Sequence, residues 1–319
     1  MSWNPSASSG SSSRIVVTGG SGRLGVSVAN HLAARGHEVV SLDRAPSELV
    51  HDGVRQLAVD LTDAAATRTA FERLRPDGVV HLAAIAVPFS APEDVILRTN
   101  AQLCLSVLTA AADAGAGRAL VASSPTVLGY GAPQGWAPEY LPIDEEHPIA
   151  PWNAYALSKA TMEATVRMFV AARGDAFRVG AFRPCFVISP QEWHGAPTQQ
   201  GHTVAERLAC PELAAVSLFN YVDARDAAGF TERWLEGAHE VPNGEVFFVG
   251  ADDAMARAPL AELVPQYFPG TERIAEPLTG TQAAFSSAKA LRLLGWRPQR
   301  SWRTELAGEP LATTSAHLS

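Results

Sequence analysis

From Arg14 onward the sequence alternates short apolar runs with longer helical stretches, and this order most constrains the fold. The apolar runs do not alternate with polar residues, which is typical of strands buried on both faces of a parallel sheet. They lie at residues 14–20, 37–43, 54–60, 78–84, 118–124 and 177–184. Predicted helices lie at 22–35, in the stretch ending at Arg75, at 93–114 and at 153–172. Because crossovers between parallel strands are right-handed, the order predicts an α/β fold with a doubly wound parallel (Rossmann) sheet.

The composition is that of a globular protein without a basic surface. Of 319 residues, 47% are hydrophobic and 18% are charged, and the net charge is −8. This acidic balance argues against a nucleic-acid partner, although it allows a local basic pocket for an anionic substrate. No run of 18 or more apolar residues indicates a membrane span. We therefore expect a small-molecule substrate and neither a nucleic-acid nor a membrane partner.

The N-terminus and the cysteines favour a cytoplasmic protein. Residues 1–13 are polar and rich in serine, without the apolar core of a signal peptide, and are predicted to form a disordered leader. The 3 cysteines show no paired spacing, which indicates reduced thiols. No spacing of cysteine or histidine is typical of a metal site, and His194 and His202 are interpreted as loop histidines rather than ligands.

The stretch VTGGSGRLG follows the first predicted strand and places Gly19, Gly22 and Gly25 in a GxxGxxG spacing. Glycines at such a turn allow the backbone to approach a pyrophosphate and let the next helix pack closely on the strand. The helix N-terminus then offers amide donors to the phosphates. The position of the motif, in the first strand–helix unit, predicts a dinucleotide site rather than a plain glycine-rich turn.

Asp43 ends the second predicted strand, where a carboxylate can accept hydrogen bonds from the adenosine ribose. It would repel a 2′-phosphate, so NAD is favoured over NADP. Arg44 comes next and offers the opposite possibility, since a guanidinium can hold a 2′-phosphate. Asp60 ends the third strand and either faces the adenine or begins a turn.

Tyr155 and Lys159 lie four residues apart in the predicted helix 153–172 and therefore share a face. Lys159 is one of only two lysines in the chain, the other being Lys289. A phenol is a poor base at neutral pH, and a nearby ammonium stabilises its phenolate and lowers its pKa. The pair is predicted to exchange a proton with a substrate hydroxyl or carbonyl.

The ordered set VTGGSGRLG, Asp43, VDL, HLAA, Asn100, SSPTVLG and YALSK resembles the extended short-chain dehydrogenase/reductase superfamily. Within it the chain is similar to the NAD-dependent epimerase/dehydratase family, over about residues 14–310. The resemblance implies an Asn–Ser–Tyr–Lys tetrad made of Asn100, Ser124, Tyr155 and Lys159, with Ser123 as the rival serine. It also implies that Asn100 shapes the backbone near the lysine.

The resemblance further places Pro184 and Val187, in the stretch RPCFV, against the nicotinamide. Together with the glycine loop and the strand-end acids it gives the predicted cofactor-binding set. That set is Gly19, Gly22, Arg23, Leu24, Gly25, Asp43, Arg44, Asp60, Leu61, Ala83, Ala84, Tyr155, Lys159, Pro184 and Val187.

After residue 184 the regular order gives way to loops rich in proline and glycine. We therefore predict an NAD-binding Rossmann domain over residues 14–183 and a substrate-binding region over 184–319. A strand–helix pair within the second region is expected to return partly to the first domain, around residues 218–236. The side chains considered for the substrate pocket are Trp193, His194, Gln199, Gln200, Arg207, Asn220, Tyr221, Arg225 and Arg292.

Two departures from the family pattern bear on the reaction. Leu128 stands where the family often has a tyrosine, so an aromatic side chain is missing there. Pro125 and Thr126 stand where sugar-nucleotide dehydratases resemble one another in carrying an Asp-Glu pair, which disfavours dehydration. The stretch SSPTVLGYGAP somewhat resembles members that oxidise sugar acids.

Three functions remain on the sequence alone. The favoured one is an NAD-dependent dehydrogenase or ketoreductase acting on a secondary alcohol or ketone of a sugar-like molecule. The alternative is a nucleotide-sugar epimerase with tightly bound NAD, and a non-catalytic dinucleotide-sensing module ranks third because the Ser–Tyr–Lys set is intact. The resemblance also implies a homodimer formed through the helices at 93–114 and 153–172.

Overall fold

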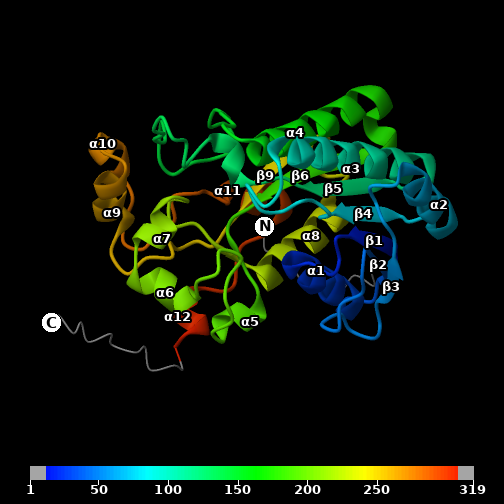
Figure 1. Cartoon of the computed structure of the whole chain (residues 1–319), viewed down its shortest axis with the longest axis horizontal. Coiled ribbons are helices and arrows are strands. Elements are labelled where there is room, and N and C mark those ends of the chain that lie inside the picture. Colours follow the sequence, from blue (N-terminus) through cyan, green and yellow to red (C-terminus); the bar gives the residue numbers. More distant parts are fainter. Residues whose placement is uncertain (1–11, 308–319) are drawn as a thin grey trace, which may run out of the picture.

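The computed structural model describes residues 12–307, so the predicted leader over residues 1–13 lies almost wholly outside the described residues. A 7-stranded sheet forms the centre of the molecule, in the order β3-β2-β1-β4-β5-β6-β9, and each neighbouring pair is parallel (Figure 1). Its strands are β1 (Arg14–Thr18), β2 (Glu38–Asp43), β3 (Arg55–Ala58), β4 (Gly78–His81), β5 (Arg118–Ala122), β6 (Arg178–Pro184) and β9 (Val246–Val249). The order reverses between β1 and β4, which confirms the predicted doubly wound Rossmann sheet.

Helices cover both faces of the sheet. One face carries α1 (Arg23–Ala34) and α8 (Ala224–Gly237), and the other carries α2 (Ala64–Leu74), α3 (Glu93–Asp113) and α4 (Ala154–Arg173) (Figure 1). The buried side chains of the two sheet faces accordingly form two separate large clusters. In β1, Ile15 and Val17 belong to the cluster under α1, whereas Val16 belongs to the cluster under α3. Each strand is thus apolar on both faces, which explains why its apolar residues run continuously.

The segments after β6 form a smaller, less regular region beside the carboxyl ends of the strands. A short parallel pair joins β7 (Val187–Ile188) to β8 (Val222–Asp223). The other elements are the 3₁₀ turns η1 (Pro125–Leu128) and η2 (Gly174–Ala176), and the helices α5 (Pro190–Trp193), α6 (Val204–Ala209), α7 (Glu212–Ala215), α9 (Leu260–Tyr267), α10 (Glu272–Ala275), α11 (Ala288–Leu294) and α12 (Trp302–Glu305).

Two elements from beyond residue 184 contribute to the sheet layers. Helix α8 packs against α1, in the stretch where the sequence indicated a return. Strand β9 comes from the second region of the sequence, yet it pairs in parallel with β6 and completes the sheet. Its sequence VFFV is buried on both faces, and the open edge of β6 provides that burial. The boundary at residue 184 therefore does not coincide with the edge of the sheet. The division into a cofactor-binding part, residues 14–183, and a substrate-binding part, residues 184–319, remains a proposal.

Among residues 12–307, only α3 is long and apolar enough to cross a membrane by length and composition. Eight of its residues are nevertheless buried within the protein, where the helix packs between α2 and α4. Such a helix is typical of the inner layer of a Rossmann fold.

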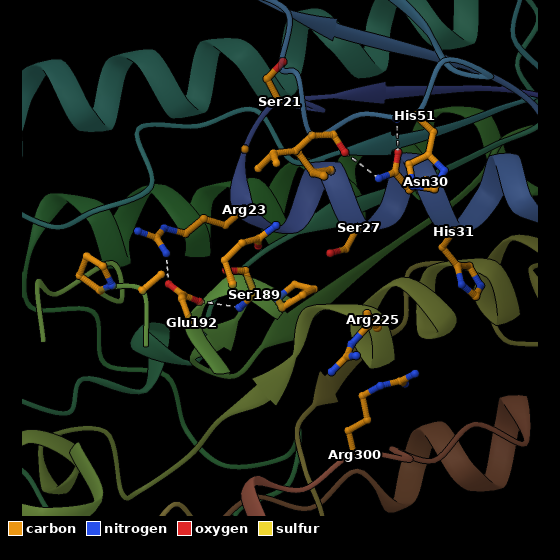
Figure 2. Close-up of a pocket in the computed structure, with 17 residues that line it drawn as sticks. Ser21, Arg23, Ser27, Asn30, His31, His51, Ser189, Glu192, Arg225 and Arg300 are labelled. Carbon is orange, nitrogen blue, oxygen red and sulfur yellow. Dashed lines mark hydrogen bonds and ion pairs between the residues drawn. The ribbon is translucent and has the colours of Figure 1, made fainter. Parts of the chain in front are cut away.

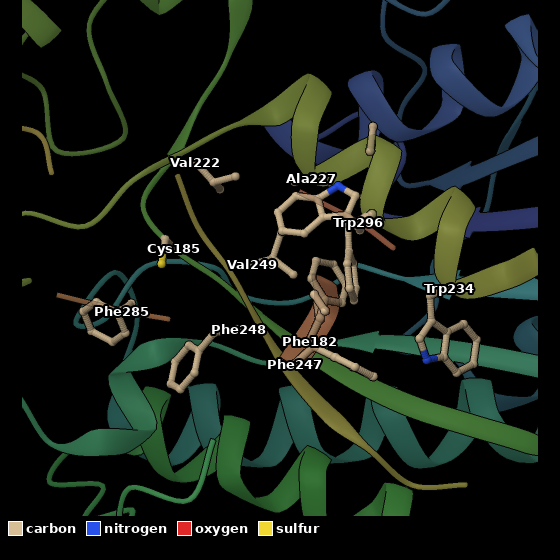
Figure 3. Packing of buried hydrophobic residues seen from close by; sticks show 14 of the residues in the cluster. Phe182, Cys185, Val222, Ala227, Trp234, Phe247, Phe248, Val249, Phe285 and Trp296 are labelled. Atoms are coloured by element: carbon tan, nitrogen blue, oxygen red, sulfur yellow. The ribbon is translucent and has the colours of Figure 1, made fainter. Parts of the chain in front are cut away.

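Aromatic side chains join α8 to the far edge of the sheet. The ring of Phe230 lies 5.6 Å from that of Phe182 on β6, 5.6 Å from that of Phe247 on β9 and 5.5 Å from that of Trp296. Figure 3 shows Phe182, Phe247 and Trp296 gathered in this cluster. Gly180 on β6 leaves room for Trp234, because a Cβ there would lie 2.8 Å from its ring. The cluster therefore fixes β9 and α8 on the sheet.

Replacing Phe230 by alanine tests this cluster. The side chain is 0% exposed, so Phe230→Ala should lower the free energy of unfolding by about 3–5 kcal/mol through lost burial and a cavity. Urea unfolding followed by circular dichroism measures the change. Leu291→Ala, at a residue 42% exposed, is the control and should shift stability by less than about 1 kcal/mol. Equal losses in the two variants would contradict the role given to the cluster.

Candidate active site

A cleft with a volume of about 1200 Å³ lies along the carboxyl edge of the sheet, where the loops after β1, β2, β4, β5 and β6 meet. This main cleft is lined by every site residue predicted from the sequence except Asn100. Those lining residues are Gly19, Gly22, Arg23, Leu24, Gly25, Asp43, Arg44, Asp60, Leu61, Ala83, Ala84, Ser124, Tyr155, Lys159, Pro184 and Val187. The topology brings them together because parallel strands place all their carboxyl ends at one edge.

The glycine loop at the start of α1 has the geometry of a phosphate cradle. Gly19 has a φ of +70°, and a Cβ there would lie 2.7 Å from the backbone nitrogen of Ala83. A Cβ on Gly25 would lie 2.1 Å from the carbonyl oxygen of Gly19. Helix α1 has no acidic residue in its first turn, and its N-cap, Gly22, has no side chain to occupy the first amides. These amides are therefore available to an anion, and the residues present fit a dinucleotide.

Asp43 lies at the end of β2 beside this loop. Its Oδ2 accepts a hydrogen bond of 3.1 Å from the backbone of Ser21, and its Oδ1 accepts one of 2.7 Å from the backbone of Arg44. Each oxygen keeps a lone pair for a ribose hydroxyl. Asp60 also lines the cleft, but its Oδ1 accepts from the backbone and hydroxyl of Thr62, which hold the pKa of this carboxyl below its usual value. Asp60 therefore begins a turn, and a contact between its carboxylate and the adenine remains a proposal.

Helix α4 delivers Tyr155 and Lys159 to the middle of the cleft. It begins after Asn153, whose side chain accepts a hydrogen bond of 2.9 Å from the backbone of Ala156 and caps the helix. Tyr155 is 8% exposed and Lys159 is 4% exposed. The ammonium nitrogen lies 5.7 Å from the centre of the Tyr155 ring and donates a hydrogen bond of 2.8 Å to the carbonyl of Ala122. The helical spacing therefore places both groups on one wall, as the sequence indicated.

The charge states of this pair differ from the expectation. Burial raises the pKa of the Tyr155 phenol to about 12, with the Ser124 hydroxyl acting in the opposite direction. Burial also lowers the pKa of Lys159 to about 8, although the nearby Cys104 and Glu163 act to raise it. The predicted lowering of the phenol pKa is thus not seen, because desolvation is the larger effect and the ammonium is bonded to Ala122. At neutral pH the phenol holds its proton and the lysine is charged.

The two serines after β5 have different surroundings. Ser123 donates its hydroxyl proton to Glu163 in a buried hydrogen bond of 2.6 Å. Ser124 caps the turn η1, and its oxygen accepts from the backbone and hydroxyl of Thr126 at 3.2 and 2.9 Å. Its hydroxyl proton has no protein acceptor among these contacts and is adjacent to the Tyr155 phenol. The geometry therefore favours Ser124 over Ser123 for contact with a reacting oxygen, which remains a proposal.

Beneath the cleft floor lies an ion pair that sequence reasoning missed. Glu163, one helical turn after Lys159, accepts hydrogen bonds from the guanidinium of Arg183 at 2.8 and 3.0 Å. Glu163 is 1% exposed and Arg183 is 4% exposed. With Ser123 they join β5, α4 and β6 directly behind the tyrosine and lysine. The four-residue spacing after Lys159 was the only signal in the sequence, and it gave no partner.

Asn100 does not line the cleft but supports its wall from α3. Its Oδ1 accepts a hydrogen bond of 2.8 Å from the backbone of Ile85, and its amide donates to Ser158 at 3.0 Å. Ser158 in turn donates to the carbonyl of Tyr155 at 2.7 Å. The chain of bonds fixes the loop after β4 relative to the first turn of α4. Asn100 therefore contacts the turn that carries Tyr155 through Ser158, the residue before Lys159, and its role in shaping the backbone near the lysine remains a proposal.

Comparison with known proteins identifies the family of this chain. The model of the NAD dependent epimerase/dehydratase family matches residues 15–250, which is more than half of the chain. The chain belongs to the NAD-dependent epimerase/dehydratase family.

The proteins to which this chain is similar include enzymes that catalyse different reactions. A UDP-glucose 4-epimerase of Corynebacterium glutamicum is 26% identical, with 95% of this chain and 96% of that protein covered. A 4-hydroxy-2-methyl-3-oxo-4-farnesyl-3,4-dihydroquinoline-1-oxide ketoreductase of Stigmatella aurantiaca is 28% identical, covering 89% of this chain and 91% of that protein. The structure of a Thermus thermophilus UDP-glucose 4-epimerase in complex with NAD matches with a TM-score of 0.64 and 25% identity, over 90% of this chain and 94% of that one. The family member is thus an NAD-dependent enzyme.

The remaining lining residues come partly from segments whose placement the sequence left open. Tyr130, after η1, lines the cleft and supplies an aromatic ring near the position where Leu128 departs from the family pattern. Trp152 lines it as well and donates to the carbonyl of Tyr130 at 3.0 Å. From the second region, Gln199 and Gln200 line the cleft.

The other second-region candidates lie elsewhere. Trp193, Asn220 and Tyr221 are buried and bonded within the protein, and His194 is exposed outside the cleft. Arg292 is exposed and also lies outside the cleft.

A second pocket of about 720 Å³ lies on the other side of the glycine loop, between α1 and residues 189–197 (Figure 2). Arg23 borders both hollows and forms an ion pair with Glu192 of α5, a carboxylate that is 1% exposed. Ser189, which begins α5, forms a capping box with Glu192. The glycine loop is therefore tied directly to the second region.

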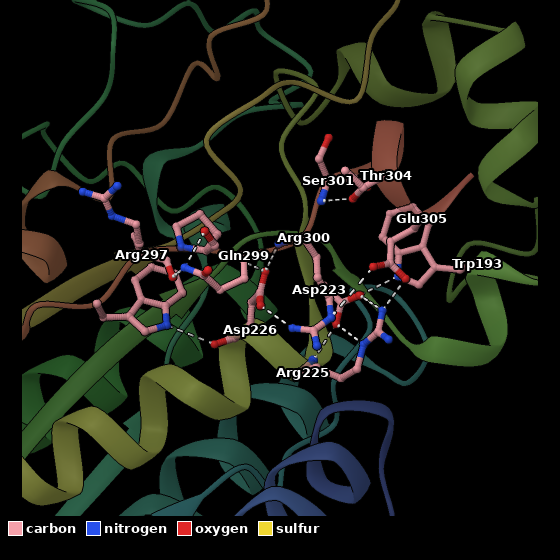
Figure 4. A network of polar contacts seen from close by, with 12 residues as sticks. Trp193, Asp223, Arg225, Asp226, Arg297, Gln299, Arg300, Ser301, Thr304 and Glu305 are labelled. Carbon is pink, nitrogen blue, oxygen red and sulfur yellow. Dashed lines mark hydrogen bonds and ion pairs between the residues drawn. The ribbon is translucent and has the colours of Figure 1, made fainter. Parts of the chain in front are cut away.

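Arg225 belongs to a structural network rather than to the main cleft. It bonds Asp223 at 2.6 Å and Glu305 of α12 at 2.6 Å, while Arg300 pairs with Asp226 at 2.8 Å (Figure 4). Trp193 donates to the same Asp223 at 2.7 Å. These contacts fasten the C-terminal segment to the start of α8, and they explain why Arg225 is not available to a substrate in the main cleft.

Asp43→Ala should change cofactor choice. Loss of hydrogen bonds to a charged acceptor predicts NAD binding weaker by about tenfold or more, with NADP binding unchanged or improved. Titration of the purified protein with each dinucleotide, followed by calorimetry, measures both affinities. Arg44→Ala is the control and should leave NAD binding within about threefold of wild type. An equal loss of both dinucleotides in Asp43→Ala would remove Asp43 from cofactor selection.

Glu163→Gln should be strongly destabilising, because it leaves the buried guanidinium of Arg183 without a counter-charge. The expected loss is about 3–5 kcal/mol in the free energy of unfolding. The double variant Glu163→Met/Arg183→Met should recover most of this loss, since neither charge is then left alone. Urea unfolding compares the two. A single variant as stable as wild type would show that the pair is not a support of the cleft floor.

Proposed function

We propose that this protein is an NAD-dependent dehydrogenase or ketoreductase acting on a secondary alcohol or ketone of a small polyhydroxy molecule. The observation that carries the proposal is the convergence of Ser124, Tyr155 and Lys159 on one wall of the main cleft. Pro184 and Val187, where the nicotinamide is expected, line the same cleft. A hydroxyl between Ser124 and Tyr155 would be next to a proton carrier and next to the cofactor.

Tyr155 is the proposed acid and base. Its phenol keeps its proton at neutral pH, so it can protonate the oxygen of a ketone as that oxygen gains charge. In the opposite direction the phenolate takes the hydroxyl proton of an alcohol. Lys159 stays charged below a pH of about 8 and stabilises the phenolate that forms when the proton leaves. Ser124 donates a hydrogen bond to the reacting oxygen.

NAD, when bound, supplies the hydride acceptor or donor for this exchange. The glycine loop and the start of α1 would hold its diphosphate, and Asp43 its adenosine ribose. Lys159 would share its ammonium hydrogens between Ala122 and the nicotinamide ribose. These assignments rest on the cradle that only glycine permits at Gly19 and Gly25 and on the free lone pairs of Asp43.

The residues after Ser124 argue against water elimination as the reaction. Pro125 has no ionisable group, and the Thr126 hydroxyl is bonded to Ser124. Dehydration needs a general acid and a general base on adjacent atoms of the substrate. This part of the lining provides neither.

The cationic side chains favour a small substrate over a nucleotide sugar. Among the described residues, the cationic side chains that line the main cleft are Arg23, Arg44 and Lys159. Arg23 and Arg44 lie where the cofactor is expected, and Lys159 lies where the reaction is expected. A nucleoside diphosphate would need further cations at the substrate end. Of the arginines considered from the sequence, Arg225 is engaged elsewhere and Arg292 is exposed outside the cleft. Arg207 is fully buried behind the lining residues Gln200 and Ser217 and is the single remaining cation among them.

An epimerase with tightly held NAD is the second candidate. Its support is the similarity to UDP-glucose 4-epimerases over nearly the whole chain, together with the same Ser124–Tyr155–Lys159 set. Epimerisation uses the same oxidation and then returns the hydride to the other face of the carbon. The dinucleotide-sensing module remains the third candidate.

We also propose a cytoplasmic homodimer. Cytoplasmic location is supported by free cysteines at positions 104, 185 and 210, since thiols persist in a reducing compartment. Dimerisation through α3 and α4 is supported by three large apolar side chains exposed on these helices, Leu105, Leu157 and Met168. Burying them against a second copy would remove apolar area from water.

Tyr155→Phe tests the proton carrier. The variant should lose at least about 1000-fold in turnover, because it removes the proposed proton carrier, while NAD binding stays within about threefold. Tyr140→Phe is the control, since that hydroxyl bonds Asp144 outside the cleft, and it should stay active. Full activity of Tyr155→Phe would overturn the proposed mechanism.

The same assay separates the two main candidates. A dehydrogenase should bind NAD exchangeably and show net formation of NADH with an alcohol, seen as absorbance at 340 nm. An epimerase should retain NAD through purification, show no net absorbance change, and interconvert UDP-glucose and UDP-galactose.

A further inference from the structure

Arg207 is a fully buried cation that the proposed mechanism does not use. It lies on α6 and is 0% exposed. Burying a guanidinium without a counter-charge is costly, so buried arginines normally face a carboxylate. The two other buried arginines of the described chain follow this rule, because Arg183 pairs with Glu163 and Arg178 pairs with Asp175. Arg207 forms no ion pair with any carboxylate in the part of the chain that the structure describes.

The neighbours of Arg207 are neutral groups instead. One terminal nitrogen lies 2.8 Å from the side-chain oxygen of Gln200 and 3.1 Å from Nε2 of His202, and the other donates to the hydroxyl of Ser217 at 3.0 Å. The Nε–H has no partner within residues 12–307. The guanidinium carbon stacks 4.1 Å from the centre of the Phe186 ring. The site is thus built around a positive charge but does not neutralise it.

These neighbours place Arg207 at the substrate end of the main cleft. Gln200, Ser217 and Phe186 all line that cleft, so both terminal nitrogens point at lining side chains. Gln200 is exposed and presents an amide oxygen to the guanidinium, the type of acceptor that a carboxylate or phosphate oxygen would replace. Tyr130, which lines the same cleft, is close enough to both Arg207 and Tyr155 for their charges to affect its phenol.

We propose that Arg207 is a specificity-determining residue that binds an anionic group of the substrate, displacing the Gln200 amide. The inference rests on the proposed function and narrows its substrate class to a small polyhydroxy molecule carrying an anion. The anion is a carboxylate on the substrate itself, because one guanidinium at this end matches one carboxylate, whereas a diphosphate would need further cations. With its reacting hydroxyl between Ser124 and Tyr155, the substrate would extend past Tyr130 to Arg207. A neutral polyol would leave the buried cation unpaired.

The first arm of the test measures binding without turnover. Calorimetry on NAD-loaded Tyr155→Phe protein compares three probes: D-galacturonate, neutral D-galactose, and UDP-galactose. Adding Arg207→Met to this protein should weaken binding of galacturonate by about 30–100-fold and binding of galactose by less than threefold. Arg207→Lys keeps the charge but loses the planar guanidinium with its two parallel donors. It should weaken binding of the anion by about tenfold while the protein stays folded.

The control is Arg257→Met, because this arginine also stacks on an aromatic ring, Trp302, but is exposed and lies outside the cleft. It should leave all three affinities unchanged. A selective loss for galacturonate supports a carboxylate site, whereas a selective loss for UDP-galactose alone would contradict it and indicate a diphosphate site. Tighter binding of galactose than of both anions, or equal losses for all probes in both Arg207 variants, would overturn the proposal.

The second arm measures turnover with Tyr155 intact, by NADH formation and by sugar interconversion. Arg207→Met should lower kcat/KM for the anionic substrate by the factor found in binding. No turnover of any alcohol together with an Arg207-dependent affinity would contradict the proposed reaction but support the anion site. Turnover of neutral alcohols that does not change in Arg207→Met would support the proposed reaction but contradict the anion site.

Discussion

The parallel pairing of all 7 strands is the constraint on which the rest of this structure depends. It requires apolar residues on both faces of the sheet and helices over each face, and it brings the carboxyl end of every strand to one edge. The glycine loop, Asp43, Ser124 and Pro184 are far apart in the sequence yet lie on one cleft for this reason. The reversal of strand order between β1 and β4 opens that cleft, and the close packing at Gly25 fixes the start of α1 beside it.

The chemistry of the cleft depends on charges that are held away from water. Lys159 is buried against the carbonyl of Ala122, and the negative charge of Glu163 one turn away favours its ammonium form, which partly offsets the cost of burial. Glu163 is itself held by Arg183, so the charge beside Lys159 is a paired one. This arrangement leaves Tyr155 protonated at rest. A phenolate is needed only while the substrate exchanges its proton, and the lysine is already charged when that occurs.

Much of this could be predicted from the sequence, because the relevant signals are local. The continuous apolar runs predict the sheet, the glycine spacing predicts the phosphate cradle, and the spacing of Tyr155 and Lys159 predicts a shared face. The missed features depend on contacts between distant segments. Strand β9 joins the sheet because β6 offers an open edge, and Glu163 acquires a role only when β6 brings Arg183 beneath it. The pKa of Tyr155 was expected to fall because spacing indicates proximity to the lysine but does not indicate the depth of burial.

Arg207 shows why substrate recognition is the hardest part to read from such a chain. In the sequence it is one arginine among more than twenty, on a short helix in a region without regular periodicity. Its distinction appears only in space, where burial removes water and no carboxylate of residues 12–307 replaces it. A desolvated cation beside a cleft interacts strongly with an anion that enters from that cleft, because little water screens them. In the proposed mechanism the sheet therefore determines where hydride and proton are exchanged, and the irregular second region supplies the cation that selects the molecule held there.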